Sequence, residues 1–372
     1  MKVCVDFQSA IGRRSGVGRY ALELVRHLPA CCTAGDRISA FYFDFKRNGA
    51  AAPAIPGAET RSCRWMPGRV AHRLWKLFGA PRYDWFAGDA DVYHFPGFVR
   101  PPMGPGRRSV VTIHDVSFLR MPETTEEKNL RYLMANIRQT AAAADAVITD
   151  SRFSADEIRE LLGVPEDRIF PIWLGLDHAA RQGDAAAARR AFGLDRPYLL
   201  TVGTLEPRKN LPFLIEVFDG LEDFDGDLVL VGGAGWKCDG IFAAMRSARR
   251  AARIHWLKFV PDDALEGLYA GAEAFVFPSR YEGFGFPPLE AAARGTPVVC
   301  ARNSSLPEVM GDAAEWVDGF SPDAWRDAIS GLLADGGKRA ALSAAGCARA
   351  ARFSWDETAR RTWAVYRRVG GC

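Results

Sequence analysis

Two glutamates near the C-terminal end of the chain stand eight positions apart, across a hinge of glycines and prolines. They are Glu282 and Glu290, in the run Ser279-Arg280-Tyr281-Glu282-Gly283-Phe284-Gly285-Phe286-Pro287-Pro288-Leu289-Glu290. A continuous helix would separate them by roughly 12 Å, too far for one small ligand. Glycines tolerate loop dihedrals and proline suits a first helical turn, so we expect Glu282 in a loop and Glu290 in the following helix. Such a pair of carboxylates can accept hydrogen bonds from paired hydroxyls, which indicates a polyhydroxylated ligand.

A basic turn precedes this run, in Gly203-Thr204-Leu205-Glu206-Pro207-Arg208-Lys209-Asn210. We expect it between a strand and a helix, where the ligands of open α/β sheets collect. Arg208 could bind a phosphate with two hydrogen bonds and Lys209 as a point charge, so together they could neutralise a pyrophosphate. The alternative is a solvated basic turn without a ligand.

Two features of the N-terminal half follow expected strands in the same way. A glycine loop containing Gly16 and Gly18 follows the first strand, and His114 follows the strand 110–113. The glycines would let the backbone approach a phosphate or an acceptor, and His114 would lie at the ligand edge of the sheet. An ordinary strand-to-helix turn and a structural histidine are the alternatives. His94 has aromatic neighbours, and we expect it to pack near a cleft wall.

The organisation of the chain follows from short apolar runs that alternate with longer helical patterns, which is typical of parallel sheets with crossover helices. This alternation of strand and helix patterns begins again at Pro197. We therefore predict an α/β protein of two doubly wound, Rossmann-like units. We place the boundary near residue 180, with domains 1–180 and 181–354. A final helix, 355–372, carries aromatic residues at helical spacing and needs an apolar surface to cover.

Composition narrows the class of protein. The chain has 372 residues, a formal charge of +3, 48% hydrophobic residues and 25% charged residues, which favours a globular protein of two domains over a dedicated nucleic-acid binder. The eight cysteines contain no C-x-x-C pair and resemble the reduced thiols of the cytosol. No secretion signal, no long apolar run and no metal-ligand spacing is evident, so we expect a cytoplasmic protein without a metal.

The segment 61–82 combines basic residues with tryptophans and aliphatic residues and contains no acid. This composition suits peripheral contact with an anionic membrane. A solvated helix packed by its aromatic residues is the alternative.

A separate segment, Ser305-Leu306-Pro307-Glu308, has the spacing of a capping box. We therefore expect a helix to begin there, with the Ser305 side chain as its cap. A ligand contact at this helix start is the other interpretation.

Taken together, four segments resemble the retaining glycosyltransferases of family four. They are Gly203 with Glu206-Pro207-Arg208-Lys209-Asn210, then 282–290, then Gly295-Thr296-Pro297-Val298-Val299, and finally 304–309 with Gly311-Asp312-Ala313-Ala314. The resemblance covers nearly the whole chain. It implies a GT-B fold, in which two Rossmann-like domains face a cleft and the last helix crosses back to the N-terminal domain. It implies no metal requirement.

The resemblance also implies a role for each matching residue. Glu282 would hold hydroxyls of the donor sugar beside the backbone N–H groups of Phe284 and Gly285, and Glu290 would hold the ribose. Arg208 and Lys209 would stabilise the leaving nucleoside diphosphate. The remaining matching residues are His114 near the sugar, Gly16 near the phosphates and acceptor, and Gly203 and Val260 at the nucleotide. In Leu257-Lys258-Phe259-Val260-Pro261 the chain departs from the family, because Lys258 stands where many relatives have glycine.

The motif details look most like bacterial mannosyltransferases of polysaccharide or lipopolysaccharide assembly, which implies GDP-mannose as the donor and no cofactor. The acceptor would be a glycan, lipid-linked and at the inner face of the cell membrane. A UDP- or dTDP-dependent glucosyl-, galactosyl- or rhamnosyltransferase of the same fold is the alternative enzyme.

Two other classes of protein were weighed. A dinucleotide oxidoreductase would need G-x-G-x-x-G after the first strand, which the glycine loop lacks. A sugar-nucleotide-binding scaffold without catalysis would keep Arg208 and Glu290 but could lose His114, so the presence of His114 favours an enzyme.

Overall fold

The computed structural model describes residues 1–12, 16–45, 53–176 and 183–371. The chain divides into two compact units. The first comprises Met1–Val116, Arg131–Gly175 and Ser354–Cys372, and the second comprises Ser117–Leu130 and Leu176–Phe353. The boundary that we predicted near residue 180 falls in 177–182, outside the described residues, and stays a prediction.

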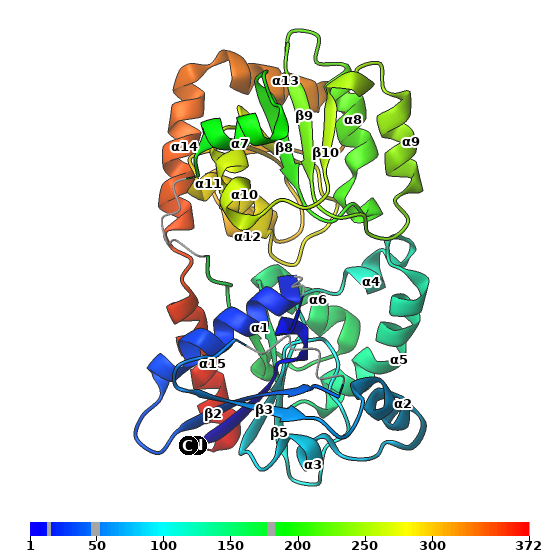
Figure 1. Ribbon diagram of the computed structural model, residues 1–372, viewed down its shortest axis with the longest axis vertical. Coiled ribbons are helices and arrows are strands. Elements are labelled where there is room, and N and C mark those ends of the chain that lie inside the picture. The colour runs from blue at the N-terminus through cyan, green and yellow to red at the C-terminus, as the bar shows by residue number, and fades with distance from the viewer. Residues whose placement is uncertain (13–15, 46–52, 177–182, 372) are drawn as a thin grey trace. The chain divides into compact units, whose positions relative to one another are not determined.

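The first unit is built on a seven-stranded parallel sheet of order β3-β2-β1-β4-β5-β6-β7 (Figure 1). Its strands are β1 (Lys2–Asp6), β2 (Arg37–Phe43), β3 (Ala58–Cys63), β4 (Val92–Phe95), β5 (Arg108–Thr112), β6 (Ala146–Thr149) and β7 (Ile169–Pro171). The central strands β4 and β6 are buried throughout. Such burial on both faces explains the apolar run Ala146-Val147-Ile148 of β6, whereas β4 also carries the buried His94.

Helices connect and cover these strands. They are α1 (Gly16–His27), α2 (Gly68–Phe78), α3 (Tyr83–Ala87), α5 (Glu127–Ala143) and α6 (Arg152–Leu162). The short helix α4 (Ser117–Arg120) lies in the segment that groups with the second unit. The predicted basic segment 61–82 is not one helix, because it contains the end of β3, the whole of α2 and the residue before α3.

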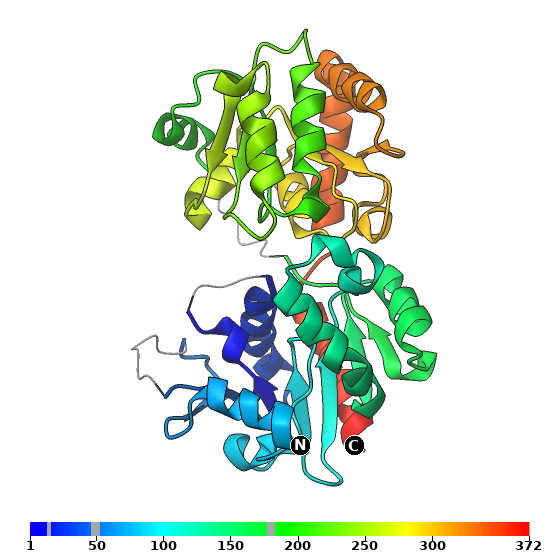
Figure 2. The ribbon, with the colours of Figure 1, turned by 90° about the vertical axis from the view of Figure 1, so that its right-hand side faces the viewer.

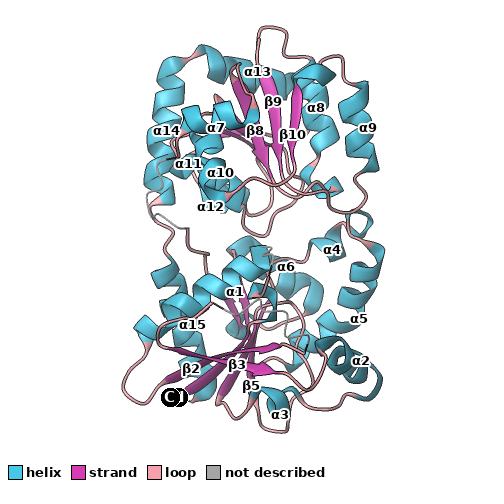
Figure 3. Ribbon diagram, in the orientation of Figure 1, coloured by secondary structure: helices cyan, strands magenta, loops and turns pink. Residues whose placement is uncertain are grey.

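The second unit repeats the architecture with a six-stranded parallel sheet of order β10-β9-β8-β11-β12-β13. Its strands are β8 (Tyr198–Val202), β9 (Asp227–Val231), β10 (Ile254–Leu257), β11 (Ala274–Phe277), β12 (Val298–Ala301) and β13 (Glu315–Val317). Its helices are α7 (Ala185–Phe192), α8 (Leu211–Asp219), α9 (Asp239–Ser247), α10 (Asp262–Ala270), α11 (Phe286–Ala293), α12 (Leu306–Met310), α13 (Pro322–Ala334) and α14 (Gly336–Ala350). Figure 3 shows helices flanking the strands in both units.

The core of the second unit is closed by aromatic side chains from its helices. Trp325 of α13 and Phe218 of α8 are fully buried and pack with residues of the central strands, among them Leu199 and Val276. Burial of each such aromatic side chain contributes about 2 kcal/mol or more. The core therefore holds β8 and β11 as neighbours, and the loops after these two strands are brought together.

The last helix, α15 (Trp355–Gly370), belongs to the first unit although it follows the second in sequence (Figure 2). Trp355, Trp363 and Tyr366 are buried on one face, as the helical spacing predicted. The Tyr366 hydroxyl lies 2.6 Å from Nδ1 of His94, a fully buried residue of β4. The prediction that the chain crosses back to its N-terminal domain is confirmed.

Candidate active site

Two loops of the second unit meet at the carboxyl ends of neighbouring strands. One follows β8 and contains Arg208 and Lys209, and the other follows β11 and contains Glu282. A backbone hydrogen bond of 2.9 Å from Arg280 to the Arg208 carbonyl ties them together. Because parallel strands end at one edge of the sheet, 73 positions of sequence separate two side chains that touch, Lys209 and Glu282.

The charged side chains of these loops form a buried network. Arg208 donates from Nη1 to Glu282 Oε2 at 3.0 Å and from Nη2 to Glu206 Oε1 at 2.7 Å. Lys209 donates from Nζ to Glu282 Oε1 at 2.6 Å. The exposed fraction is at most 17% for each of the four side chains. Arg208 and Lys209 are therefore paired with protein carboxylates and are not solvated side chains of an exposed basic turn.

Electrostatics explain the charge state of Glu282. Burial alone would raise the pKa of this carboxyl, but the charges of Arg208 and Lys209, with hydrogen bonds from Lys209 and Ser279, lower it to about 2. The Ser279 hydroxyl donates to Glu282 Oε1 at 2.5 Å. Burial in turn lowers the pKa of Lys209, although Glu282 opposes this effect. A negative Glu282 thus compensates two cations that burial would otherwise disfavour.

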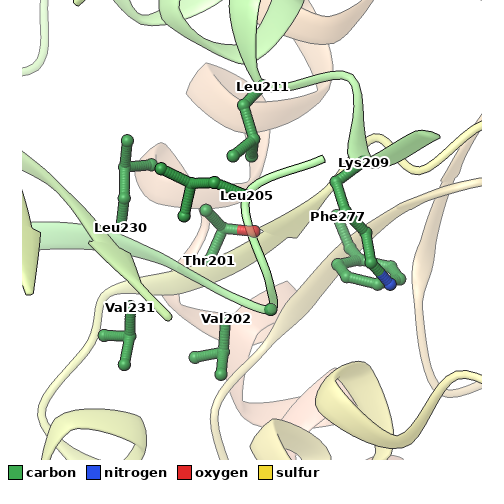
Figure 4. Close-up of a pocket in the computed structure, with 9 residues that line it drawn as sticks. Thr201, Val202, Leu205, Lys209, Leu211, Leu230, Val231 and Phe277 are labelled. Carbon is green, nitrogen blue, oxygen red and sulfur yellow. The ribbon is translucent and has the colours of Figure 1, made fainter. Parts of the chain in front are cut away.

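The amine of Lys209 lies against an aromatic ring at the end of β11. Its Nζ is 5.1 Å from the centroid of the Phe277 ring, and Figure 4 shows the two side chains next to each other beside a cavity of about 10 Å³. Gly203 lines the same cavity. Its backbone has a φ of 154°, which residues other than glycine rarely adopt. The glycine predicted at the nucleotide is therefore needed for the turn that brings the chain back toward Lys209.

A serine pair fixes the backbone of the Glu282 loop. The Glu282 N–H donates to Ser304 Oγ at 3.0 Å, and the Ser305 hydroxyl donates to the carbonyls of Glu282 and Phe284 at 2.9 and 3.0 Å. Helix α12 does begin after Ser305, but the side chain of Ser305 caps no N–H group of that helix. The predicted helix start is therefore confirmed, but the Ser305 hydroxyl supports the neighbouring loop instead of capping the helix.

The hinge between the two glutamates has the predicted form. Glu282 lies in the loop, and α11 begins at Phe286 with a proline in its first turn and contains Glu290. Gly285 before it has a φ of 103°, and a Cβ atom there would lie 2.7 Å from a methyl carbon of Leu306. Glu290 accepts a 2.8 Å hydrogen bond from the Tyr269 hydroxyl. The two carboxylates therefore have different environments, one in an ion network and one beside a tyrosine.

In the first unit, His114 follows β5 and is almost fully buried. Its Nδ1 lies 2.8 Å from Asp150 Oδ2, and its Nε2 lies 3.0 Å from the Pro96 carbonyl. The Pro96 carbonyl can only accept and an ionised Asp150 also accepts, so the two contacts favour the imidazolium, in which both ring nitrogens donate. Burial opposes this charge, but Asp150 outweighs it and raises the pKa of His114. Asp150 and the Pro96 carbonyl thus favour the charged form of the buried His114.

Gly16 is the first residue of α1 and is exposed, with open space around its Cα. The preceding part of the glycine loop, 13–15, lies outside the described residues.

Comparison with known proteins identifies the family. The family description "Glycosyltransferase Family 4" matches residues 14–180, and "Glycosyl transferases group 1" matches residues 184–349. The chain is 33% identical to O-antigen chain mannosyltransferase B of Escherichia coli over 95% of this chain and 96% of that protein.

The chain is a glycosyltransferase of family 4.

Other relatives agree with this assignment. D-inositol 3-phosphate glycosyltransferase of Segniliparus rotundus is 28% identical over 80% of this chain and 68% of that protein. Sucrose-phosphate synthase from Thermosynechococcus elongatus has a similar fold, with a TM-score of 0.77 and 20% identity over 100% of this chain and 99% of the other. The family resemblance and the GT-B fold are thereby confirmed, and the family makes the chain a sugar-transferring enzyme.

For this glycosyltransferase, the structure brings together three of the predicted site residues, Arg208, Lys209 and Glu282. Phe284 and Gly285 lie in the same loop and are buried, as is Val260 before α10. Beside Val260, Phe259 is 68% exposed and Lys258 Nζ lies 5.1 Å from the Trp256 ring centroid. The roles of all the predicted site residues toward the donor stay predictions. They are Gly16, His114, Gly203, Arg208, Lys209, Val260, Glu282, Phe284, Gly285 and Glu290.

Several supporting residues of the site were missed. Glu206 and Ser279 lie inside the motifs that were recognised, but their types alone do not show that they bind Arg208 and Glu282. Asp150 could have been found, because it is a polar residue directly after the buried strand β6. Tyr269 lies in α10 and carried no signal.

His94, in contrast, packs as predicted. Its Nε2 lies 2.8 Å from the Thr112 hydroxyl, and burial together with the charge of His114 lowers its pKa to about 3. It is a neutral residue of the core.

Two searches concern only the described part of the chain. No group of three or more His, Cys, Asp or Glu side chains within it is placed to hold a metal ion. None of the helices in those residues has both the length and the apolar character that crossing a membrane requires.

Proposed function

We propose that this glycosyltransferase moves mannose from GDP-mannose to a lipid-linked glycan, with retention of configuration, in the assembly of an O-antigen polysaccharide. The observation that carries the proposal is the 33% identity, over nearly the full length of both chains, to a protein named O-antigen chain mannosyltransferase B. The network around Glu282 supplies the chemistry that such a reaction needs.

The leaving group of the reaction is a nucleoside diphosphate, and Arg208 and Lys209 are the cations proposed to bind it. In the structure Glu282 forms ion pairs with both of them, and Glu206 forms a second one with Arg208. A diphosphate would take over this role, because it presents negative oxygens to the same buried donors. Glu282 could then accept hydrogen bonds from hydroxyls of the sugar. Two protein cations at the diphosphate also support a reaction without a metal ion.

The proposed reaction proceeds on one face of the sugar. The bond between the anomeric carbon and the phosphate oxygen breaks, and the acceptor oxygen forms its bond from the same side. The acceptor proton passes to the departing phosphate oxygen, so neither a protein nucleophile nor a protein base is required. His114 fits this scheme as a source of positive charge, because Asp150 and Pro96 already accept from its two nitrogens.

For the acceptor we propose a cavity of about 540 Å³ in the first unit. Its walls include Ile11 and Gly12 of the glycine loop, Phe43 of β2, Asp44 and Pro67. Apolar walls with a few polar groups are typical of small-molecule sites. The position beside the loop that leads to Gly16 agrees with the role proposed for that loop.

We propose that the segment 61–82 contacts the cytoplasmic face of the membrane peripherally. Its large apolar side chains Trp65, Leu77 and Phe78 are 68%, 63% and 72% exposed. Exposed basic residues of α2, among them Arg73, accompany them. Apolar anchors flanked by cations favour binding to anionic lipids.

A thermal-shift experiment in EDTA with GDP, UDP, dTDP and NAD tests the donor. A ligand at a hundred times its dissociation constant adds about 2.7 kcal/mol to the unfolding free energy. Stabilisation by GDP alone is expected. Stabilisation by UDP or dTDP alone would instead indicate a UDP- or dTDP-linked donor. This alternative stands because Lys258 replaces the glycine that many relatives have near the nucleobase. Slow release of GDP from GDP-mannose without acceptor would separate an enzyme from a binding scaffold.

A further inference from the structure

A second pocket of the first unit is lined in part by helix α2, which belongs to the segment 61–82 proposed above to contact the membrane. Its volume is about 340 Å³, and its walls come from α2, from the loop after β4 and from residues 132–143 of α5. The polar side chains among its lining residues are those of His72, Lys76, Arg100, Tyr132, Asn136 and Gln139, with Thr140 below them. Trp75 forms an aromatic wall.

The pocket is lined by hydrogen-bond donors and contains no acid. Lys76 and Arg100 carry full positive charges, the amides of Asn136 and Gln139 can donate, and no aspartate or glutamate is among the lining residues. No carboxylate of the described residues forms a salt bridge with Lys76 or Arg100, whereas Arg61, Arg64 and Arg82 nearby in sequence each have one. A pocket with this balance favours an anion.

Arg100 is built into the wall rather than extended into solvent. Its backbone N–H donates to Thr140 Oγ1 at 3.1 Å and its Nε donates to Ser109 Oγ at 2.8 Å. Burial lowers the pKa of Arg100. These contacts use the Nε edge and hold the side chain in place, so the two terminal nitrogens of the guanidinium can bind an oxyanion such as phosphate.

Apolar side chains project from the helix beside the pocket. Leu77 and Phe78 follow Lys76 on α2 and are 63% and 72% exposed, and Tyr132 lines the pocket and is itself 42% exposed. A ligand with an anionic head and an apolar body would therefore be complementary to both features. A free phosphate would use only the first.

We propose that this pocket binds a phosphate ester carried by a lipid, so that the enzyme recognises a lipid head group and not only the charge of the membrane. The inference goes beyond glycosyl transfer and rests on the proposed function for the presence of a membrane and for the position of the acceptor. His72 lines both this pocket and the proposed acceptor cavity. A lipid held here would thus lie next to the glycan that the enzyme elongates.

The test is binding of the full chain to phosphatidylcholine vesicles with and without phosphatidylglycerol. The matched variants are Arg100→Gln in the pocket wall and Arg73→Gln, which removes an exposed charge of α2 that does not line the pocket. Loss of one surface cation weakens binding about five-fold. Loss of a charge-assisted bond to phosphate weakens it about ten-fold or more. We expect the larger loss for Arg100→Gln, and Arg100→Lys should restore most of the binding.

General attraction to an anionic surface predicts the opposite ranking, because Arg73 is exposed and Arg100 is recessed. Equal losses, or a larger loss for Arg73→Gln, would overturn the proposal. Arg100→Gln also loses the Nε hydrogen bond to Ser109, so thermal unfolding is measured to establish that the variant is folded at the assay temperature. Acceptor-independent GDP release should be unchanged, so failure of this proposal is distinguishable from failure of the donor assignment.

Calorimetry with soluble glycerol phosphate separates the two sources of phosphate. We expect only weak binding that Arg100→Gln abolishes, because the apolar contacts are missing. Tight binding of glycerol phosphate, together with vesicle binding that Arg100→Gln leaves intact, would assign the pocket to a soluble anion and refute the lipid.

Discussion

Replacing Glu282 by glutamine should strengthen the binding of GDP while it slows transfer of the sugar. Glu282 forms ion pairs with Arg208 at 3.0 Å and with Lys209 at 2.6 Å. The diphosphate of GDP is proposed to bind the same two cations, so the carboxylate competes with it. Glutamine keeps the size and one acceptor oxygen of the side chain but removes the competing charge.

The magnitude follows from the pKa of Glu282. This pKa falls from 4.5 to about 2, which stabilises the charged carboxylate by about 3 kcal/mol. That value is the upper limit of the gain, because glutamine retains part of the hydrogen bonding. We expect GDP to bind about 5 to 150 times more tightly, which corresponds to about 1 to 3 kcal/mol. The ligand-free variant should lose stability of the same order.

Isothermal titration with GDP in EDTA measures the affinity, and release of GDP from GDP-mannose measures the turnover. Ser279→Ala is the matched control, because it removes a 2.5 Å hydrogen bond to Glu282 and leaves all three charges in place. It should change the affinity for GDP little. Weaker binding of GDP to Glu282→Gln, in parallel with its loss of turnover, would refute the idea that the carboxylate and the diphosphate share the cations.

Three further predictions concern other residues of the site. Arg208→Ala and Lys209→Ala should each lower turnover about 100-fold or more, because each variant loses a charge that stabilises the leaving group. Circular dichroism should show that the fold is retained. Near-normal rates in both variants would show that these residues do not bind the diphosphate. The folded state raises the pKa of His114, so the stability that wild type has over His114→Gln should be complete below about pH 6.5 and decline as the pH rises through the raised pKa. Urea unfolding at a series of pH values measures this difference, and a difference that grows with pH would contradict a charged histidine. Tyr269→Phe removes the 2.8 Å hydrogen bond to Glu290 and should raise KM for the donor about five-fold with kcat unchanged; a fall in kcat alone would exclude a role of this pair in binding.

Much of the fold could be predicted from the sequence, because local patterns carry it. The strand predicted at 110–113 overlaps β5 (Arg108–Thr112), since buried parallel strands are continuous apolar segments. The hinge that puts Glu282 in a loop and Glu290 in α11 follows from glycine and proline chemistry, which also acts locally. Such features depend on residues that are close in sequence.

The partners of the charged residues depended on the tertiary structure. Nothing local to Glu282 indicates that it neutralises Lys209, 73 positions away, and this contact exists because β8 and β11 are neighbours in the sheet. The same applies to His114, whose charge comes from Asp150 at the end of the next strand. Ser305 shows the limit of local reasoning, because its spacing predicted a cap and its hydroxyl supports a loop more than twenty positions away.

The sequence by itself therefore determined the elements, the motifs and the family of this enzyme. The order of the strands decided which side chains meet at their ends, and with it which groups are charged when buried. Burial and pairing set these charges, and both are properties of the folded chain alone.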